Sequence, residues 1–254
     1  MDKLGKGLKV VFTPAEFERL PERDLSGTVC VVFDVLRATS SMITALANGA
    51  EAIRPVQEIS EALVLKRENA KVVLAGERDG VRIRKDLTGT TDFDLGNSPR
   101  EFTTGAIGGR RIVMTTTNGT RALRACAGAK RVLVGSFLNL GVTAERAAGV
   151  DELVVVCSGT FEEAAYEDTL AAGALCELVW RNFESGRIAD SALMARRLWH
   201  GARDDLAGAL AESRNGRRLL DRPELSDDVA FCARIDAFSF CVEMGKDGWV
   251  SRRT

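Results

Sequence analysis

An acid and a base stand together at the end of one apolar run of the chain. In VVFDVLRATSSMITALANG, residues 31–49, three apolar residues lead to Asp34 and Arg37, and hydroxyl residues beginning at Thr39 open an Ala-rich segment. A carboxylate can bind a hard cation, and an arginine beside the free N–H groups of a helix start can bind a phosphate or carboxylate. Asp34 and Arg37 could instead pair with each other and cap the helix, and these residues alone leave both interpretations open.

A second acid, Glu77, follows the apolar run KVVLA within the segment GERDG. The segment that comes next is long and irregular, and loops of that length inside compact domains are more often functional than idle. It ends in FDLGNSPREF, where Asn97 favours a turn and Ser98 can cap a helix. For Ser98 and Glu101 a simple helix start is the preferred interpretation.

Two further polar segments follow apolar runs later in the chain. MTTTNGTRAL places Thr117, Asn118 and Gly119 after RRIVM, and hydroxyl, amide and glycine groups at a helix start suit an oxyanion without adding charge. CSGTFEEAAYEDTLAAG places Glu167 and Asp168 near the start of a long helix. Acids there usually complement the helix dipole, which is the simpler interpretation of Glu167, so Asp168 is the better site candidate.

The available residue types restrict the chemistry to oxygen and arginine groups. The chain has one histidine, His200, and six cysteines scattered among apolar neighbours without a C-x-x-C pair. We expect the cysteines to be small buried residues in a reducing compartment, with no disulfide or zinc framework. Carboxylates without histidines or clustered thiolates favour Mg²⁺, and Mg²⁺ beside an anion pocket suggests phosphoryl transfer or hydrolysis.

Several known phosphate-binding patterns are absent from the sequence. No G-x-x-x-x-G-K-[ST] is present, which excludes a P-loop NTPase, and no G-x-G-x-x-G follows an apolar run. A haloacid-dehalogenase-type phosphatase would need a second acid where the chain has Leu36. A single histidine excludes the histidine phosphatases, and the spacing of Cys30 and Arg37 does not match the loop of the cysteine phosphatases.

The elements that must position these residues alternate along the chain. Runs that are apolar throughout are typical of a parallel sheet covered on both faces, and helical patterns separate them. We therefore predict an α/β fold, layered α/β/α with mainly parallel strands, whose polar loops meet at one sheet edge. A helical region from Asp190 and a short hairpin complete the chain. Strands are predicted near residue 10 and from residues 28, 51, 71, 110, 131 and 152, and helices over residues 39–48, 58–69, 119–127, 140–148 and 166–183.

Size and charge limit the class of protein further. The 254 residues can bury a large core, and no linker marks a boundary, so we predict a single α/β unit over residues 1–254 that could contain two closely packed lobes. The 36 acids and 35 bases give no net field to attract nucleic acid or an anionic membrane. No apolar run approaches the ~20 residues that span a bilayer, and MDKLGKGLKV lacks a signal-peptide core, so we expect a cytoplasmic protein. A homodimer is permitted but not required.

Five segments, taken together and in order, resemble one family. FDVLRATSSMITALANGA, GERDG, FDLGNSPREF, TTTNGTRAL and CSGTFEEAAYEDTLAAG are similar to the ComB family of 2-phosphosulfolactate phosphatases. The resemblance implies a Mg²⁺-dependent phosphatase with a distinct α/β fold, which hydrolyses (2R)-2-phospho-3-sulfolactate to 3-sulfolactate and phosphate in coenzyme M biosynthesis. The polar motif positions that it implies are Asp34, Arg37, Thr39, Glu77, Asn97, Ser98, Thr117, Asn118, Gly119 and Asp168.

These positions lead to a hypothesis for the site. Asp34, Glu77 and Asp168 would gather Mg²⁺, directly or through water, and Asp34 could also attack phosphorus or act as a base for water. The catalytic groups would be Asp34, Arg37 and Asp168, and the substrate would be bound by Arg37, Thr39, Asn97, Ser98, Thr117, Asn118 and Gly119.

The implied substrate carries a sulfonate and a carboxylate besides its phosphate, which requires more positive charge than Arg37 and one Mg²⁺ provide. Arg78, Arg100 and Arg121 are the available reserves, although each is by default a solvated surface residue. Two alternatives stay open: a phosphatase of another small phosphorylated acid, and a non-catalytic protein that binds a phosphorylated or sulfonated metabolite.

Overall fold

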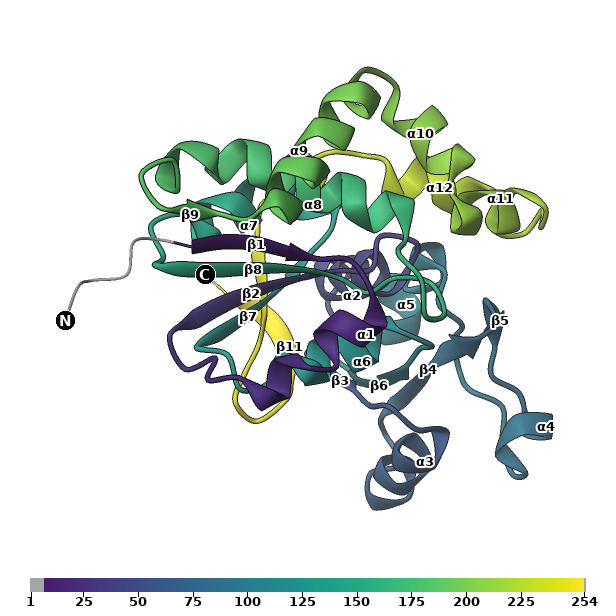
Figure 1. Cartoon of the computed structure of the whole chain (residues 1–254). Helices are drawn as coiled ribbons and strands as arrows, with labels where there is room; N and C mark the ends of the chain where they lie inside the picture. Colours follow the sequence, from purple (N-terminus) through teal and green to yellow (C-terminus); the bar gives the residue numbers. More distant parts are fainter. Residues whose placement is uncertain (1–6, 254) are drawn as a thin grey trace.

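The computed structural model describes residues 7–253, which form an eleven-stranded sheet flanked by helices (Figure 1). The order of strands across the sheet is β5-β4-β6-β3-β11-β10-β7-β2-β8-β1-β9. The strands are β1 (Gly7–Val11), β2 (Thr28–Phe33), β3 (Ala52–Pro55), β4 (Val73–Arg78), β5 (Val81–Arg82), β6 (Arg111–Thr115), β7 (Arg131–Gly135), β8 (Glu152–Cys157), β9 (Arg187–Ile188), β10 (Cys241–Met244) and β11 (Val250–Arg253).

Helices connect the strands and form a C-terminal cluster. Four of the five predicted helices are found with ends within two residues of the prediction, and the fifth ends earlier and continues as a 3₁₀ turn. The α-helices are α1 (Pro14–Phe17), α2 (Ala38–Ala47), α3 (Ile59–Glu68), α4 (Lys85–Thr88), α5 (Thr104–Ile107), α6 (Gly119–Ala125), α7 (Leu140–Ala147), α8 (Tyr166–Val179), α9 (Asp190–Ala202), α10 (Leu206–Glu212), α11 (Arg214–Leu220) and α12 (Asp227–Cys232). The 3₁₀ helices are η1 (Leu20–Glu22), η2 (Pro99–Glu101), η3 (Phe137–Asn139), η4 (Trp180–Asn182) and η5 (Arg203–Asp205).

The sheet consists of two parallel groups joined by an antiparallel hairpin. One group contains β3, β6 and β4, and the other contains β7, β2, β8, β1 and β9. The hairpin β10–β11 pairs antiparallel with β7 on one side and with β3 on the other, there through the single pair Val250–Ile53. The predicted fold class is confirmed, but the two parallel groups formally run in opposite directions across the hairpin.

This reversal determines how the polar loops come together. A purely parallel sheet would present all its carboxyl ends at one edge, as the sequence predicts, whereas here β2 and β4 lie six steps apart in a mixed sheet. A twist of about 20–25° per step turns the strands by about 120–150° over that distance, which nearly cancels the reversal. The carboxyl ends of β2 and β4 therefore point toward the same side of the molecule, where β5 and α11 lie (Figure 1).

Helices cover both faces of the sheet. Every residue of β2 is buried, and its side chains alternate between two cores. Val31 and Phe33 pack with α7, α8 and α9, whereas Cys30 and Val32 pack with α2 and α6. Apolar, mostly β-branched residues suit a central strand that is covered on both faces. The layered α/β/α arrangement therefore holds β2 rigidly, and the site begins at its last residue.

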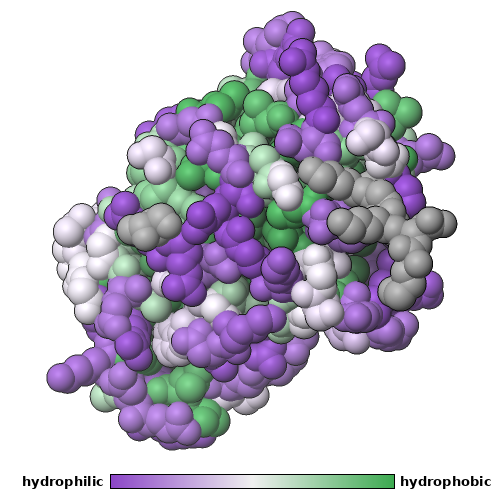
Figure 2. Space-filling model, turned by 90° about the vertical axis from the view of Figure 1, so that its left-hand side faces the viewer, coloured by the Kyte–Doolittle hydropathy of each residue, from purple (hydrophilic) through white to green (hydrophobic). Residues whose placement is uncertain are grey.

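The side of the molecule away from β5 and α11 is mostly polar with interspersed apolar patches (Figure 2). No helix within residues 7–253 is long and apolar enough to cross a membrane. All six cysteines lie in the described part of the chain, where they are buried and free, as expected. The cytoplasmic location and the homodimer stay predictions.

Candidate active site

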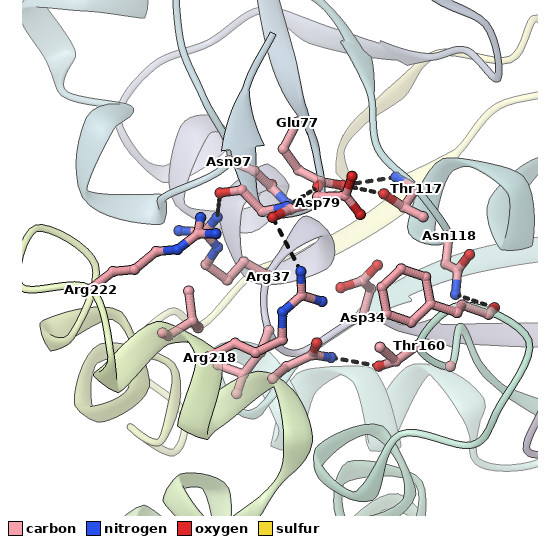
Figure 3. A pocket seen from close by; sticks show the side chains of 16 residues that line it. Asp34, Arg37, Glu77, Asp79, Asn97, Thr117, Asn118, Thr160, Arg218 and Arg222 are labelled. Carbon is pink, nitrogen blue, oxygen red and sulfur yellow. Dashed lines mark hydrogen bonds between the residues drawn. The ribbon is translucent and has the colours of Figure 1, made fainter.

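Six of the predicted site residues line one pocket at the carboxyl ends of β2, β4 and β6 (Figure 3). They come from separate segments: one pair follows β2, one residue lies near the end of β4, one lies before η2, and two precede α6. The structure thus brings together Asp34, Arg37, Glu77, Asn97, Thr117 and Asn118.

Asp34 reaches the pocket from the start of α2. Its Oδ1 accepts a hydrogen bond from Ala38 N at 3.0 Å, and Thr39 Oγ1 accepts from the Asp34 N–H and donates to the Asp34 carbonyl. Thr39 is buried behind the pocket wall, so it positions Asp34 and does not face a ligand. A Cβ atom at Gly119 would lie 2.4 Å from Asp34 Oδ2, so the absence of a side chain at Gly119 lets α6 approach this carboxylate.

The Asp34 carboxyl is harder to ionise than an ordinary aspartate. Its pKa is raised from 3.8 to about 6, chiefly by burial; the hydrogen bond from Ala38 opposes the shift, and the charges of Glu77 and Glu167 add to it. A carboxylate with such a pKa is a stronger base than a solvated aspartate and can exchange a proton near neutral pH.

Arg37 pairs with Asp228 on α12, and not with Asp34. Arg37 Nη1 donates to Asp228 Oδ2 at 2.8 Å, and the two side chains are 4% and 0% exposed. Arg37 Nη2 donates to Gly80 O at 3.1 Å. Arg37 therefore lines the pocket with its charge already balanced by a buried acid, which the local sequence could not indicate because the partner lies far along the chain.

Asp228 also accepts hydrogen bonds from two residues at the start of η2. Ser98 Oγ and Arg100 Nε donate to its Oδ1 at 2.7 and 2.8 Å. Ser98 forms a capping box with Glu101 at the start of η2, as the helix-start interpretation predicts, and it lines a neighbouring groove instead of the pocket. Sequence reasoning missed Asp228 because nothing in the pattern of α12 distinguishes it from the adjacent surface acid.

Glu77, near the end of β4, joins the β4–β5 turn to the loop before α6. Its Oε1 accepts from the backbone N and Oγ1 of Thr117 at 2.8 and 3.0 Å, and its Oε2 accepts from Gly80 N at 2.7 Å. Thr117 thus directs both donors at Glu77 and away from a phosphate. Asn118 is oriented by a hydrogen bond from its Nδ2 to Phe161 O at 2.9 Å.

Asn97 presents a buried side-chain oxygen, Oδ1, that has no hydrogen-bond partner among the described residues. The loop around it is fixed, because Ser41 Oγ donates to the Asn97 carbonyl at 2.7 Å. An unsatisfied buried acceptor is costly unless a ligand, ion or water completes it. Because Asn97 is also a lining residue of the pocket, its Oδ1 is a candidate acceptor for a bound group.

Asp168 lies behind the pocket and not in its wall. Its Oδ1 accepts from Val35 N at 2.8 Å, and its Oδ2 accepts from Ser158 Oγ at 3.1 Å and Gly159 N at 3.2 Å. Burial, and then the charges of two neighbouring acids, raise the pKa of Asp168 well above its ordinary value. Asp168 joins the loop after β2 to the loop after β8, and so positions Asp34.

Carboxylate and amide oxygens of Asp34, Glu77 and Asn97 form a donor set that suits a hard cation. Mg²⁺ is usually bound by one or two carboxylates together with substrate phosphate and water, and two pocket carboxylates fit that pattern. Across residues 7–253, however, no group of three His, Cys, Asp or Glu side chains is placed to hold a metal ion. The three predicted ligands are therefore not gathered as one direct set, since Asp168 lies outside the pocket. Magnesium itself stays a prediction.

Helix α11 and the residues after it supply a pocket wall that sequence reasoning missed. Part of the signal was present in RNGRRLLDR, because Asn215, Arg218 and Leu219 are spaced by three and four positions and share one face of α11, whereas Arg222 lies beyond its end. No strand is predicted in this region, so the sequence did not indicate which part of the molecule this helix face would pack against. The pocket residues from this segment are Asn215, Arg218, Leu219 and Arg222.

None of the three arginines named as reserves lines this pocket. Each makes contacts elsewhere: Arg78 donates to Gln57 O and Thr115 Oγ1, Arg100 pairs with Asp227 and Asp228, and Arg121 pairs with Glu18 and Glu162. The positive charge that completes the pocket comes instead from Arg218 on α11 and Arg222 in the turn after it.

Acids and arginines gathered at the ends of α/β strands are typical of enzymes that act on small anionic molecules. The sequence model of a family described as 2-phosphosulpholactate phosphatase matches residues 15–247. A relative from Pseudothermotoga lettingae, named probable 2-phosphosulfolactate phosphatase, is 37% identical over 92% of this chain and 96% of its own length. Relatives with the same name from Caldicellulosiruptor saccharolyticus (39% identical; 91% and 95% covered) and Symbiobacterium thermophilum (38%; 85% and 90%) are similar. The chain belongs to the 2-phosphosulfolactate phosphatase family, as the resemblance predicts.

Proposed function

We propose that this protein is a phosphatase that hydrolyses (2R)-2-phospho-3-sulfolactate to (2R)-3-sulfolactate and inorganic phosphate. The observation that carries the proposal is Asp34, a carboxylate of raised pKa in a pocket that also contains arginines, in a chain of this family. The reaction adds water across the P–O ester bond. The hydroxyl group of water goes to phosphorus, and a proton goes to the released sulfolactate oxygen.

Asp34 can serve this reaction in two ways. As a base it would accept a proton from the attacking water, which its raised pKa favours near neutral pH. As a nucleophile it would form an aspartyl-phosphate that water then hydrolyses. Acid quenching during turnover of ³²P-labelled substrate separates the routes, because only the second leaves label on Asp34.

The surrounding residues have positioning roles in this proposal. Asp168 fixes the Asp34 loop from behind, and Glu77 holds the Thr117 loop against it. Arg37 would orient phosphoryl oxygens through the N–H groups that Asp228 and Gly80 leave unused, and it adds little net charge because Asp228 balances it. Asn118 and Gly119 border the space beside Asp34 that the phosphoryl group would occupy.

We also propose Mg²⁺ as the cofactor of this reaction, held by the carboxylates of Asp34 and Glu77 with Asn97 Oδ1 as a further donor. When bound, the ion would neutralise charge on the phosphoryl oxygens. Support comes from the all-oxygen donor set and from the unpartnered Asn97 oxygen. If Asp34 is a ligand of Mg²⁺, a different group must accept the proton of the attacking water. In that case the labelling experiment above would leave no label on Asp34.

A panel of phosphate monoesters, assayed with and without Mg²⁺ by phosphate release, tests the proposal. We expect kcat/KM to be highest for phosphosulfolactate, above phosphoglycolate and phosphoglycerate, and turnover to disappear with EDTA and return with Mg²⁺. Tight binding of phosphosulfolactate without phosphate release from any ester would make this a binding protein. Preference for another phosphorylated acid would replace the substrate while keeping the reaction.

A further inference from the structure

The residues that the strand loops contribute to the pocket do not carry enough positive charge to bind a substrate with several anionic groups. Three acids line it, Asp34, Glu77 and Asp79, and the one arginine contributed by those loops is Arg37. Because Asp228 already neutralises Arg37 at 2.8 Å, the strand side of the pocket offers little net positive charge to a ligand. Phosphosulfolactate would bring a carboxylate and a sulfonate in addition to its phosphate, so a further cationic surface is needed.

Arg218 and Arg222 supply that surface. Both line the pocket, both are partly exposed, and neither forms an ion pair with an acid in the described part of the chain, unlike Arg37. Arg218 Nη2 donates to Asp79 O at 3.2 Å, and its guanidinium lies 5.3 Å from the centre of the Phe161 ring. Arg222 Nη1 is close to Gly80, at 3.5 Å from the point where a Cβ would stand. Both guanidinium groups therefore lie at the pocket without a neutralising acid among residues 7–253.

The segment that carries these arginines, α11 and the turn after it, is firmly placed. Asn215 Nδ2 donates to Thr160 Oγ1 and to Glu167 Oε1, both at 2.6 Å, and Leu219 is buried on the same face. Arg222 lies two residues beyond the end of α11, where its N–H donates to Leu219 O at 3.1 Å. The two arginine side chains reach adjacent residues of the β4–β5 turn, because Arg218 donates to Asp79 O and Arg222 lies beside Gly80. One ligand can therefore meet both guanidinium groups.

The geometry also separates two ends of the pocket. Arg218 and Arg222 enter from the side of α11, Thr117 and Asn118 lie on the opposite side, and Asp34 lies between them (Figure 3). A phosphoryl group at Asp34 would thus leave the rest of a small substrate facing the two arginines. Guanidinium groups match carboxylate and sulfonate oxygens through paired N–H donors, which a single lysine could not provide.

We propose that Arg218 and Arg222 bind the carboxylate and sulfonate of the substrate and so set the specificity of the site for a phosphate ester that carries additional anionic groups. This inference rests on the proposed phosphatase function. It assigns the two arginines to recognition of the part of the substrate that does not react.

The test compares two esters that share a three-carbon skeleton phosphorylated at its central carbon. Glycerol 2-phosphate has hydroxyl groups where phosphosulfolactate has its carboxylate and sulfonate. For Arg218→Gln and for Arg222→Gln we expect kcat/KM toward phosphosulfolactate to fall about 10- to 100-fold, as for loss of a charged hydrogen bond, and kcat/KM toward glycerol 2-phosphate to change less than about threefold. Arg217→Gln is the matched control, because Arg217 lies on the same helix, is exposed and donates to Glu212 O. It should leave both values unchanged.

A binding measurement keeps the test independent of turnover. Calorimetric titration with 3-sulfolactate should show an affinity about 10- to 100-fold weaker for the two variants than for wild type and Arg217→Gln, with unchanged thermal unfolding. Arg218→Lys, which keeps the charge but loses the paired donors, should recover part of that affinity.

The failures of the two proposals are distinguishable. An equal loss of kcat/KM toward both esters, or an unchanged affinity for 3-sulfolactate, would overturn the recognition role. The two arginines would then have a structural role only. Absence of phosphate release from phosphosulfolactate by the wild-type protein would overturn the proposed function. Weaker sulfolactate binding by the variants would still support the arginine site in that case.

Discussion

The pocket has two walls of different construction. The wall formed by the loops after β2, β4 and β6 is buried and closely hydrogen-bonded: Glu77 alone accepts three hydrogen bonds, and Arg37 is held by Asp228. The wall formed by α11 and the turn after it is partly exposed, and its two pocket arginines, Arg218 and Arg222, make one side-chain hydrogen bond to backbone and one ring contact in the described structure.

This difference separates two tasks. Reacting groups must be held within a fraction of an ångström, which requires the dense packing that strand ends provide. Recognition of the non-reacting part of a ligand tolerates longer side chains that settle on contact. The strand wall should therefore control the rate of turnover, and the helix wall should control the choice of substrate.

The sharpest test of the strand wall is Asp34→Asn. We expect kcat to fall by at least about 10²-fold, because the amide can neither accept a proton nor attack phosphorus. Phosphate release from phosphosulfolactate measures the loss, and thermal unfolding should show an intact fold. Near-normal turnover would remove Asp34 from the chemistry and leave the two walls without a functional distinction.

Asp228→Ala tests whether the strand wall depends on its buried ion pair. Removal leaves the buried Arg37 without its acid, and breaking such a pair costs about 3–5 kcal/mol of folding free energy. Urea unfolding measures the change. Asp227→Ala is the control, because that carboxylate is 78% exposed and pairs with Arg100 at 3.2 Å, so it should cost less than about 1 kcal/mol. Equal effects of the two substitutions would contradict the burial argument.

Gly119→Ala adds one methyl group beside the reacting carboxylate. Its Cβ would stand 2.4 Å from Asp34 Oδ2 and 2.7 Å from Ala38 Cβ, so Asp34 must move. We expect turnover to fall about 10- to 100-fold with little loss of helix stability, since alanine favours a helix. Gly105→Ala in α5, where a Cβ meets open space, should leave turnover unchanged. Full activity of Gly119→Ala would show that α6 does not constrain Asp34.

The smallest expected effect is the pH dependence of folding stability in EDTA. The pKa of Asp34 is raised to about 6 in the folded protein, so between about pH 4 and 6 the folded state binds more protons than the unfolded state. Stability contributed by protonated Asp34 is complete below the unfolded pKa and is lost as pH rises through 6, with a slope of at most about 1.4 kcal/mol per pH unit for one group. Urea unfolding across this range should show a shallower slope for Asp34→Asn than for wild type, while Arg217→Gln should follow wild type.

Local pattern predicted most of the elements and six of the residues that line the pocket. The apolar runs and the Ala-rich segments gave the strands and helices, because their periodicity reflects burial that is decided within a few residues. Asp34, Glu77 and the Thr117 loop were found because polar residues directly after a buried strand must leave the core at its end. Thr39, Ser98 and Asp168 were proposed as residues at helix starts and from the family resemblance, and the structure places them outside the pocket wall.

The rest depends on contacts between distant parts of the chain. The partner of Arg37 lies 191 residues away, and no spacing in the sequence distinguishes Asp228 from its exposed neighbour. The hairpin β10–β11 inserts between the two parallel groups, so accumulated twist, and not a common edge, brings the ends of β2 and β4 together. Arg218 lies on the helix face that the contacts of Asn215 hold against the pocket, and Arg222 reaches the same pocket from the turn after α11. The sequence thus determined which groups are available for chemistry. Tertiary packing decided which of these groups lie in one pocket and which of their charges are paired, because burial and pairing depend on neighbours in space.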